Sequence, residues 1–140
     1  MIEQEKKYRR VWYVVLCKSQ SRHWLLNRLG NGHVYAVRKS PAGTMWTIVD
    51  PTNSILEVTT TPVSIMERPE DHSEYATRVI RCIVEPELFT GFKLRLGVMS
   101  CVTLIKALLC VSRWYVLTPD QLGDYLIKSG MGKEIKRGDV

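Results

Sequence analysis

Three side chains in this sequence are of the types that a thiol-dependent hydrolase needs. His33 opens the run HVYAV and Asp50 closes the run MWTIVD, so a hairpin of these runs would bring imidazole and carboxylate together at one end of a sheet. Cys101 lies much further along the chain. A cysteine nucleophile needs an imidazole that pairs with its thiolate and protonates the leaving group, and the imidazole needs an acceptor that sets its tautomer. With Cys101 as nucleophile, the three residues predict acyl-transfer chemistry.

Cys101 is the cysteine whose expected surroundings favour a reactive thiolate. It falls in the first turn of a predicted helix after a Gly-containing loop, where free N–H groups and the helix dipole stabilise negative charge. The same N–H groups can hold an oxyanion. Cys17 and Cys82 fall inside predicted strands and Cys110 near the far end of the helix, so we expect packing roles for them. Because the cysteines lack CxxC spacing and the chain shows no secretory signal, the sequence predicts free thiols without disulfides. The spacing also argues against zinc, and no metal or cofactor is expected.

Strands must position the histidine and the aspartate, and a helix must position the cysteine. Apolar or alternating runs bounded by turn residues predict a meander of strands at 11–17, 33–37, 45–50, 55–65 and 77–84. A short helix or irregular crossover is expected at 20–32. Helices are predicted after Ser100 as N-cap and from Thr118, again as N-cap, to Gly130. This order of elements, strands followed by helices, predicts an α+β fold. We expect an antiparallel sheet of about five strands with the Cys-bearing helix and a C-terminal helix packed on it.

The whole chain fits a single domain at residues 1–140. Its 140 residues, 45% of them hydrophobic, are enough for one core. The basic residues behind the +6 charge are scattered, with local excess only in EKKYRR and KEIKRGDV, which we expect to be short solvated tails. Nucleic acid binding is therefore not indicated and rests on net charge alone. The sequence shows no secretory signal and no membrane-spanning run, which predicts a cytoplasmic or virion-associated protein.

Two segments of the chain resemble known cysteine enzymes. HVYAV and MWTIVDPT resemble the His and Asp half of transglutaminase-like enzymes, at His33, Tyr35, Trp46, Ile48, Val49, Asp50 and Pro51. SCVTLIKALL resembles the cysteine helix of papain-like and NlpC-type hydrolases, with Cys101 in the nucleophile's place. Here the cysteine helix follows the histidine strand, which is the order of circularly permuted papain-like enzymes, including the lecithin:retinol acyltransferase-like proteins. The resemblance implies a permuted papain-like fold with Cys101, His33 and Asp50 as its triad.

Other polar side chains are candidates for the third residue of the site or for its oxyanion hole. The permuted enzymes more often carry a second histidine or an amide as the third polar residue, so Asp50 takes its role from a differently ordered family. Gln20 and Tyr13 are candidates by type for the oxyanion hole. His23 and His72 are expected to be solvated, the former in a crossover beside a tryptophan and the latter in an acidic exposed loop.

Two classes of function follow. The first is a thiol-dependent hydrolase or acyltransferase acting on a peptide, a cell-wall peptide, an isopeptide or a lipid ester, and fold analogy does not choose among these substrates. The second is a structural or adaptor protein on the same fold, such as a phage virion or tail-associated component that assembles with protein partners. An enzyme predicts that the thiol and the imidazole lie within hydrogen-bond reach.

Overall fold

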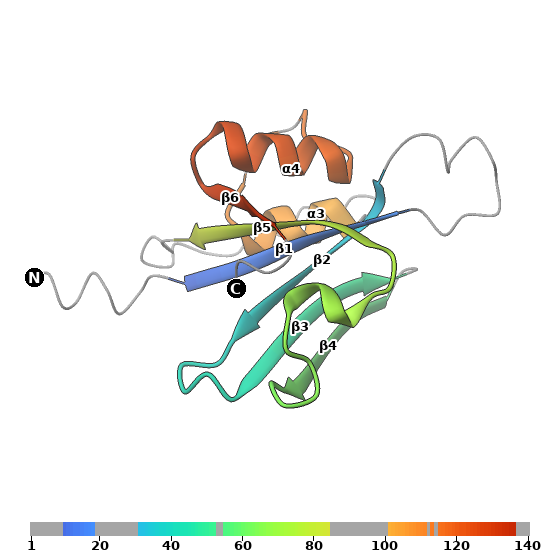
Figure 1. Ribbon diagram of the computed structural model, residues 1–140. Helices are drawn as coiled ribbons and strands as arrows, with labels where there is room; N and C mark the ends of the chain where they lie inside the picture. The colour runs from blue at the N-terminus through green and yellow to red at the C-terminus, as the bar shows by residue number, and fades with distance from the viewer. Residues whose placement is uncertain are drawn as a thin grey trace, which may run out of the picture.

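The computed structural model of the protein describes residues 10–18, 31–52, 55–84, 101–111, 113 and 115–136. Its strands are β1 (Arg10–Lys18), β2 (Asn31–Lys39), β3 (Met45–Thr52), β4 (Ile55–Pro62), β5 (Ala76–Val84) and β6 (Gly132–Ile135). Its helices are the 3-10 turn η1 (Pro69–His72), α3 (Cys101–Leu108) and α4 (Pro119–Lys128). The strands form one antiparallel sheet in the order β4-β3-β2-β1-β5-β6 (Figure 1).

The α+β fold class is confirmed, and each of the five predicted strands is present. The sixth strand, β6, was not expected, because KEIKRGDV was interpreted as a solvated tail. Instead its first residues belong to β6, which pairs with β5 from Gly132 opposite Cys82 to Ile135 opposite Val79. So short an edge strand has no periodicity of its own and depends on the neighbour it pairs with. Residues 20–30 of the predicted crossover, the Ser100 cap and both chain ends lie outside the described residues, whereas Asn31 and Gly32, also expected in the crossover, begin β2.

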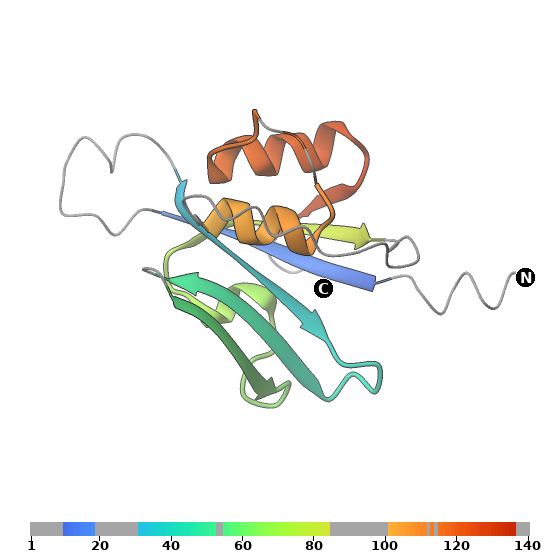
Figure 2. The same ribbon diagram turned by 180° about the vertical axis from the view of Figure 1, so that it is seen from behind.

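Both faces of the sheet are covered, by different parts of the chain. Helices α3 and α4 lie on one face (Figures 1 and 2). On that side the buried core comprises Trp12, Val14, Leu16, Val34, Ala36, Ile80, Cys82, Val84, Val102, Ile105, Leu109, Val111, Val116, Leu122 and Leu126. The opposite face has its own core of Val15, Cys17, Tyr35, Val37, Trp46, Ile48, Met66 and Val79. The central strand β1 is buried on both faces, which explains its nearly unbroken apolar sequence.

On the face opposite the helices, residues 63–75 are held against the sheet by buried hydrogen bonds. The Trp46 indole Nε1 donates to the Met66 carbonyl at 2.6 Å. The Tyr35 hydroxyl donates to the Pro69 carbonyl at 2.9 Å. Because both donors are fully buried, each needs its partner, and the two bonds attach this segment to strands β2 and β3.

Helix α4 has the ends that its sequence predicts. The Thr118 hydroxyl accepts from the Gln121 N–H, the Gln121 side chain accepts from the Thr118 N–H, and Pro119 takes the first helical position. Gly130 follows the helix with φ of +79°, which glycine adopts without strain. None of the helices within the described residues is long and apolar enough to cross a membrane.

The turn that follows helix α3 contains a residue with an unfavourable backbone conformation. Cys110 has φ of +58°, while its N–H donates to the Ala107 carbonyl and the Val111 N–H donates to the Lys106 carbonyl. These bonds form a Schellman motif with a cysteine where glycine is usual. Cys110→Gly should therefore raise the free energy of unfolding by about 1 kcal/mol, measured by urea denaturation. Cys110→Ser, which keeps the Cβ strain, is the control and should leave stability unchanged, and equal stability of all three proteins would contradict the prediction.

Candidate active site

The hairpin of β2 and β3 brings His33 and Asp50 together. Their pairing ends where Ala36 opposes Val49, so Asp50 is the next residue of β3 and His33 lies diagonally across from it. Alternation along the strands puts both side chains on the face that carries Tyr35. His33 Nε2 lies 2.6 Å from Asp50 Oδ1, a length typical of a charge-assisted hydrogen bond.

Cys101 reaches the same end of the sheet from the side covered by the helices. It is the first residue of α3 and is partly buried. Its sulfur is hydrogen-bonded to the His33 side chain and to the backbone N–H groups of Val34 and Val102. Because Nε2 of His33 is occupied by Asp50, the ring nitrogen left for the sulfur is Nδ1. The structure thus brings the three predicted site residues into one hydrogen-bonded chain.

The hydrogen bonds among Cys101, His33 and Asp50 favour the charged form of each side chain. The hydrogen bonds of His33 with Asp50 and then with Cys101 raise the pKa of His33 from 6.5 to about 9, against the opposing effect of burial. Burial alone would raise the pKa of Cys101, but the hydrogen bond from His33 and those from the two backbone N–H groups lower it. For Asp50, burial is likewise outweighed by hydrogen bonds from two histidines, which hold its pKa well below the usual range. Near neutral pH these directions favour a thiolate–imidazolium pair beside an ionised carboxylate.

Two of the other cysteines have surroundings that oppose ionisation. Cys17 lies opposite His33 in β1, where burial raises the pKa of its thiol to about 11. Burial raises the pKa of Cys82 to about 12. Cys110 is exposed at the far end of α3. Both Cys17 and Cys82 belong to the hydrophobic cores, which agrees with the packing roles expected for them.

His72 is a member of the site that the sequence did not reveal. As expected it is exposed to solvent, but its Nε2 also lies 3.1 Å from Asp50 Oδ2 and its ring packs edge-on against Tyr35, with centroids 5.0 Å apart. The segment ERPEDHSE has neither helical nor strand periodicity, so no local pattern indicated which surface its histidine would meet. Its place depends on how η1 folds back over the sheet.

The suggested oxyanion-hole side chains are not part of the described site. Tyr13 lies opposite Val37, four residues along β2 from His33 and about 13 Å away at ~3.3 Å per residue. Its ring packs edge-on against Trp46 at 5.8 Å. That candidate is therefore wrong, and Gln20 lies outside the described residues. Besides His33, the donors that face the Cys101 sulfur are the backbone N–H groups of Val34 and Val102.

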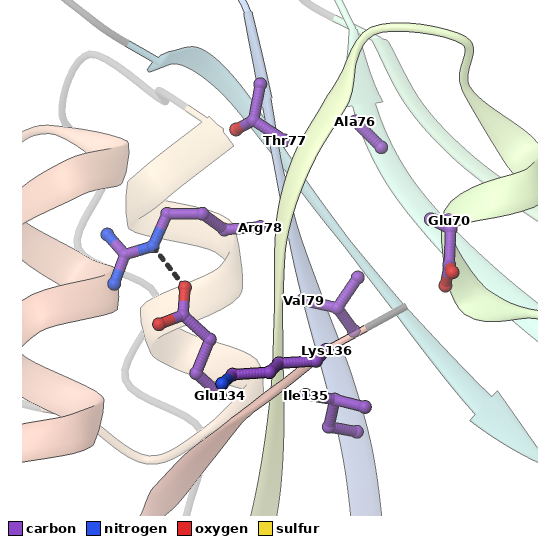
Figure 3. Close-up of a pocket in the computed structure, with 8 residues that line it drawn as sticks. All are labelled: Glu70, Ala76, Thr77, Arg78, Val79, Glu134, Ile135 and Lys136. Carbon is purple, nitrogen blue, oxygen red and sulfur yellow. Dashed lines mark hydrogen bonds and ion pairs between the residues drawn. The ribbon is translucent and has the colours of Figure 1, made fainter. Parts of the chain in front are cut away.

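A separate hollow of about 530 Å³ lies at the β5–β6 edge of the sheet (Figure 3). It is lined by Glu70, Ala76, Thr77, Arg78, Val79, Glu134, Ile135 and Lys136. Arg78 Nε is paired with Glu134 Oε1 at 2.7 Å across one side of it. None of the triad residues lines this hollow, and its lining supplies no thiol or imidazole. The three predicted site residues thus lie outside this hollow.

The geometry of the described residues does not indicate a metal site. Within the described ranges, no group of three or more histidine, cysteine or acidic side chains is arranged to hold a metal ion. The cluster around Asp50 is instead connected by hydrogen bonds of its carboxylate with His33 and His72.

No protein-family model, no curated protein and no solved structure matches this chain.

Proposed function

We propose that this protein is a thiol-dependent hydrolase or acyltransferase that acts on an amide or ester carbonyl. The observation that carries the proposal is the hydrogen-bonded chain Cys101–His33–Asp50, whose nucleophile stands in the first turn of α3. The proposal also agrees with the resemblance to circularly permuted papain-like enzymes, in which the histidine strand precedes the cysteine helix.

Acylation begins with attack of the Cys101 thiolate on the carbonyl carbon. The new S–C bond moves an electron pair onto the carbonyl oxygen, and in this proposal backbone N–H groups at the start of α3 stabilise the oxyanion. As the oxyanion collapses, the C–N or C–O bond breaks and His33 gives its proton to the departing amine or alcohol. The products of this half-reaction are a thioester at Cys101 and a neutral His33 hydrogen-bonded to Asp50.

Deacylation runs the same steps in reverse with a second nucleophile. Neutral His33 removes a proton from water, or from an acceptor alcohol or amine, as the oxygen or nitrogen attacks the thioester. Collapse of this second intermediate breaks the S–C bond, which restores the thiolate and the protonated imidazole. Asp50 keeps its negative charge throughout and stabilises the imidazolium in both resting and intermediate states.

The acyl-enzyme is the intermediate to detect. Wild-type protein mixed with p-nitrophenyl acetate should release a burst of nitrophenol equal to the protein concentration, followed by slower turnover, with the acetyl group mapped to Cys101 by mass spectrometry. Cys101→Ala should lose the burst and the turnover, whereas Cys110→Ser should keep both. A peptide amide and a lipid ester tested in parallel would then compare the two substrate classes.

Acetylation spread over the exposed Cys110, or a burst that survives in Cys101→Ala, would reject the proposal. A protein that shows neither label nor turnover with any activated ester would instead support a non-catalytic role for this fold.

A further inference from the structure

Asp50 is held by two histidines, one on each carboxylate oxygen. His33 Nε2 lies 2.6 Å from Oδ1, and His72 Nε2 lies 3.1 Å from Oδ2. A carboxylate that accepts from only one donor can rotate about its Cβ–Cγ bond, whereas one held at both oxygens has a defined plane. The orientation of the oxygen that serves His33 thus depends on the second contact.

His72 is itself fixed by the two strands that carry His33 and Asp50. It ends η1, and its ring packs edge-on against Tyr35 of β2 with an interplanar angle of 72°. The Tyr35 hydroxyl holds the first residue of η1 through the Pro69 carbonyl, and Trp46 of β3 holds the Met66 carbonyl just before it. These donors are fully buried, so η1 is anchored on the same framework as the triad.

We propose that His72 is a positioning residue of this site, in addition to the triad. By donating its Nε2–H to Asp50 Oδ2, it sets the plane of the carboxylate so that Oδ1 accepts from His33 and the opposite ring nitrogen faces Cys101. The role requires an N–H donor at this point rather than an aromatic ring. This inference rests on the proposed function, because the geometry that His72 maintains is that of the Cys101–His33 pair.

Two matched substitutions at His72 separate the effect of its hydrogen-bond donor from the effect of its ring packing. Glutamine places its Nε2 the same number of bonds from the backbone as histidine does, so His72→Gln keeps the donor and loses the ring. His72→Phe keeps a ring that can pack against Tyr35 and loses the donor. The readout is the rate at which iodoacetamide alkylates Cys101 near neutral pH, resolved by peptide mass spectrometry, with exposed Cys110 as the internal control in each sample.

If His72 acts through its N–H, His72→Phe should slow alkylation of Cys101 about tenfold, and His72→Gln should stay within about twofold of wild type. Alkylation of Cys110 should be unchanged in both. Thermal melts verify that each variant is folded, and His72→Leu, which also lacks a donor, replaces the phenylalanine variant should that protein not fold.

Wild-type reactivity in His72→Phe would overturn the inference, and so would an equal loss in both variants, since packing would then be what matters. Either result leaves the proposed function standing as long as wild-type Cys101 reacts faster than Cys110. If wild-type Cys101 reacts no faster than Cys110, the proposed function fails and the role of His72 fails with it.

Discussion

Replacement of His33 by alanine is expected to slow the alkylation of Cys101 by iodoacetamide near neutral pH by at least about tenfold. In the wild type, the imidazole hydrogen-bonds the sulfur and lowers the pKa of the Cys101 thiol. Without the imidazole, its pKa-lowering effect is lost, while burial still raises the thiol pKa. The rate at each cysteine can be followed by peptide mass spectrometry across a range of pH values.

The pH dependence of Cys101 alkylation tests whether His33 acts by lowering the pKa of the thiol. The wild-type rate should level off at a lower pH than the rate in His33→Ala, because the thiolate forms at lower pH when the imidazole is present. Exposed Cys110 should give the same profile in both proteins, which controls for reagent and buffer effects. Coinciding profiles for Cys101 would mean that no thiolate–imidazolium pair exists.

Stability gives a second readout of the same variant. Because the folded protein raises the pKa of His33 from 6.5 to about 9, its pairing stabilises the fold fully below pH 6.5 and is lost as the pH rises through about 9. Asp50 has a lowered pKa, so its contribution is present above 3.8 and is lost as the pH falls. The difference in free energy of unfolding between wild type and His33→Ala should therefore be largest at about pH 4 to 6.5 and shrink towards pH 9. A difference that grew with pH would contradict this assignment.

Trp46→Ala should have the largest effect on stability, a loss of about 3–5 kcal/mol. The indole is fully buried in the core opposite the helices, contacts the ring of Tyr13 and donates to the Met66 carbonyl. The substitution leaves a cavity and also leaves a carbonyl without its donor. Urea denaturation followed by far-UV circular dichroism measures the change.

Ile65→Ala is the matched control for this segment. Ile65 is 77% exposed and lies next to Met66, so its truncation should change stability by less than about 0.5 kcal/mol. A loss below about 1 kcal/mol in Trp46→Ala would indicate that residues 63–75 are not anchored through the indole.

Much of the fold follows from local patterns along the chain. The apolar run of β1, the alternation in β2, β3 and β5 and the capping box at Thr118 all lie within a few residues and mark elements that the structure contains. The turn after Lys39 also makes β2 and β3 neighbours, so the approach of His33 to Asp50 could be anticipated from a hairpin alone. Helix spacing after Ser100 likewise placed Cys101 in a first turn.

The rest of the site depends on contacts between distant segments. Only the tertiary structure decided that the start of α3 meets β2, that His72 of η1 reaches Asp50 of β3 and that Tyr13 packs against Trp46. It also decided that four residues after α4 complete the sheet as β6. Residue types and spacing by themselves determined which side chains have the chemistry, because periodicity and capping are local. Which of them meet, and that a second histidine joins them at Asp50, was decided by long-range packing that no local pattern encodes.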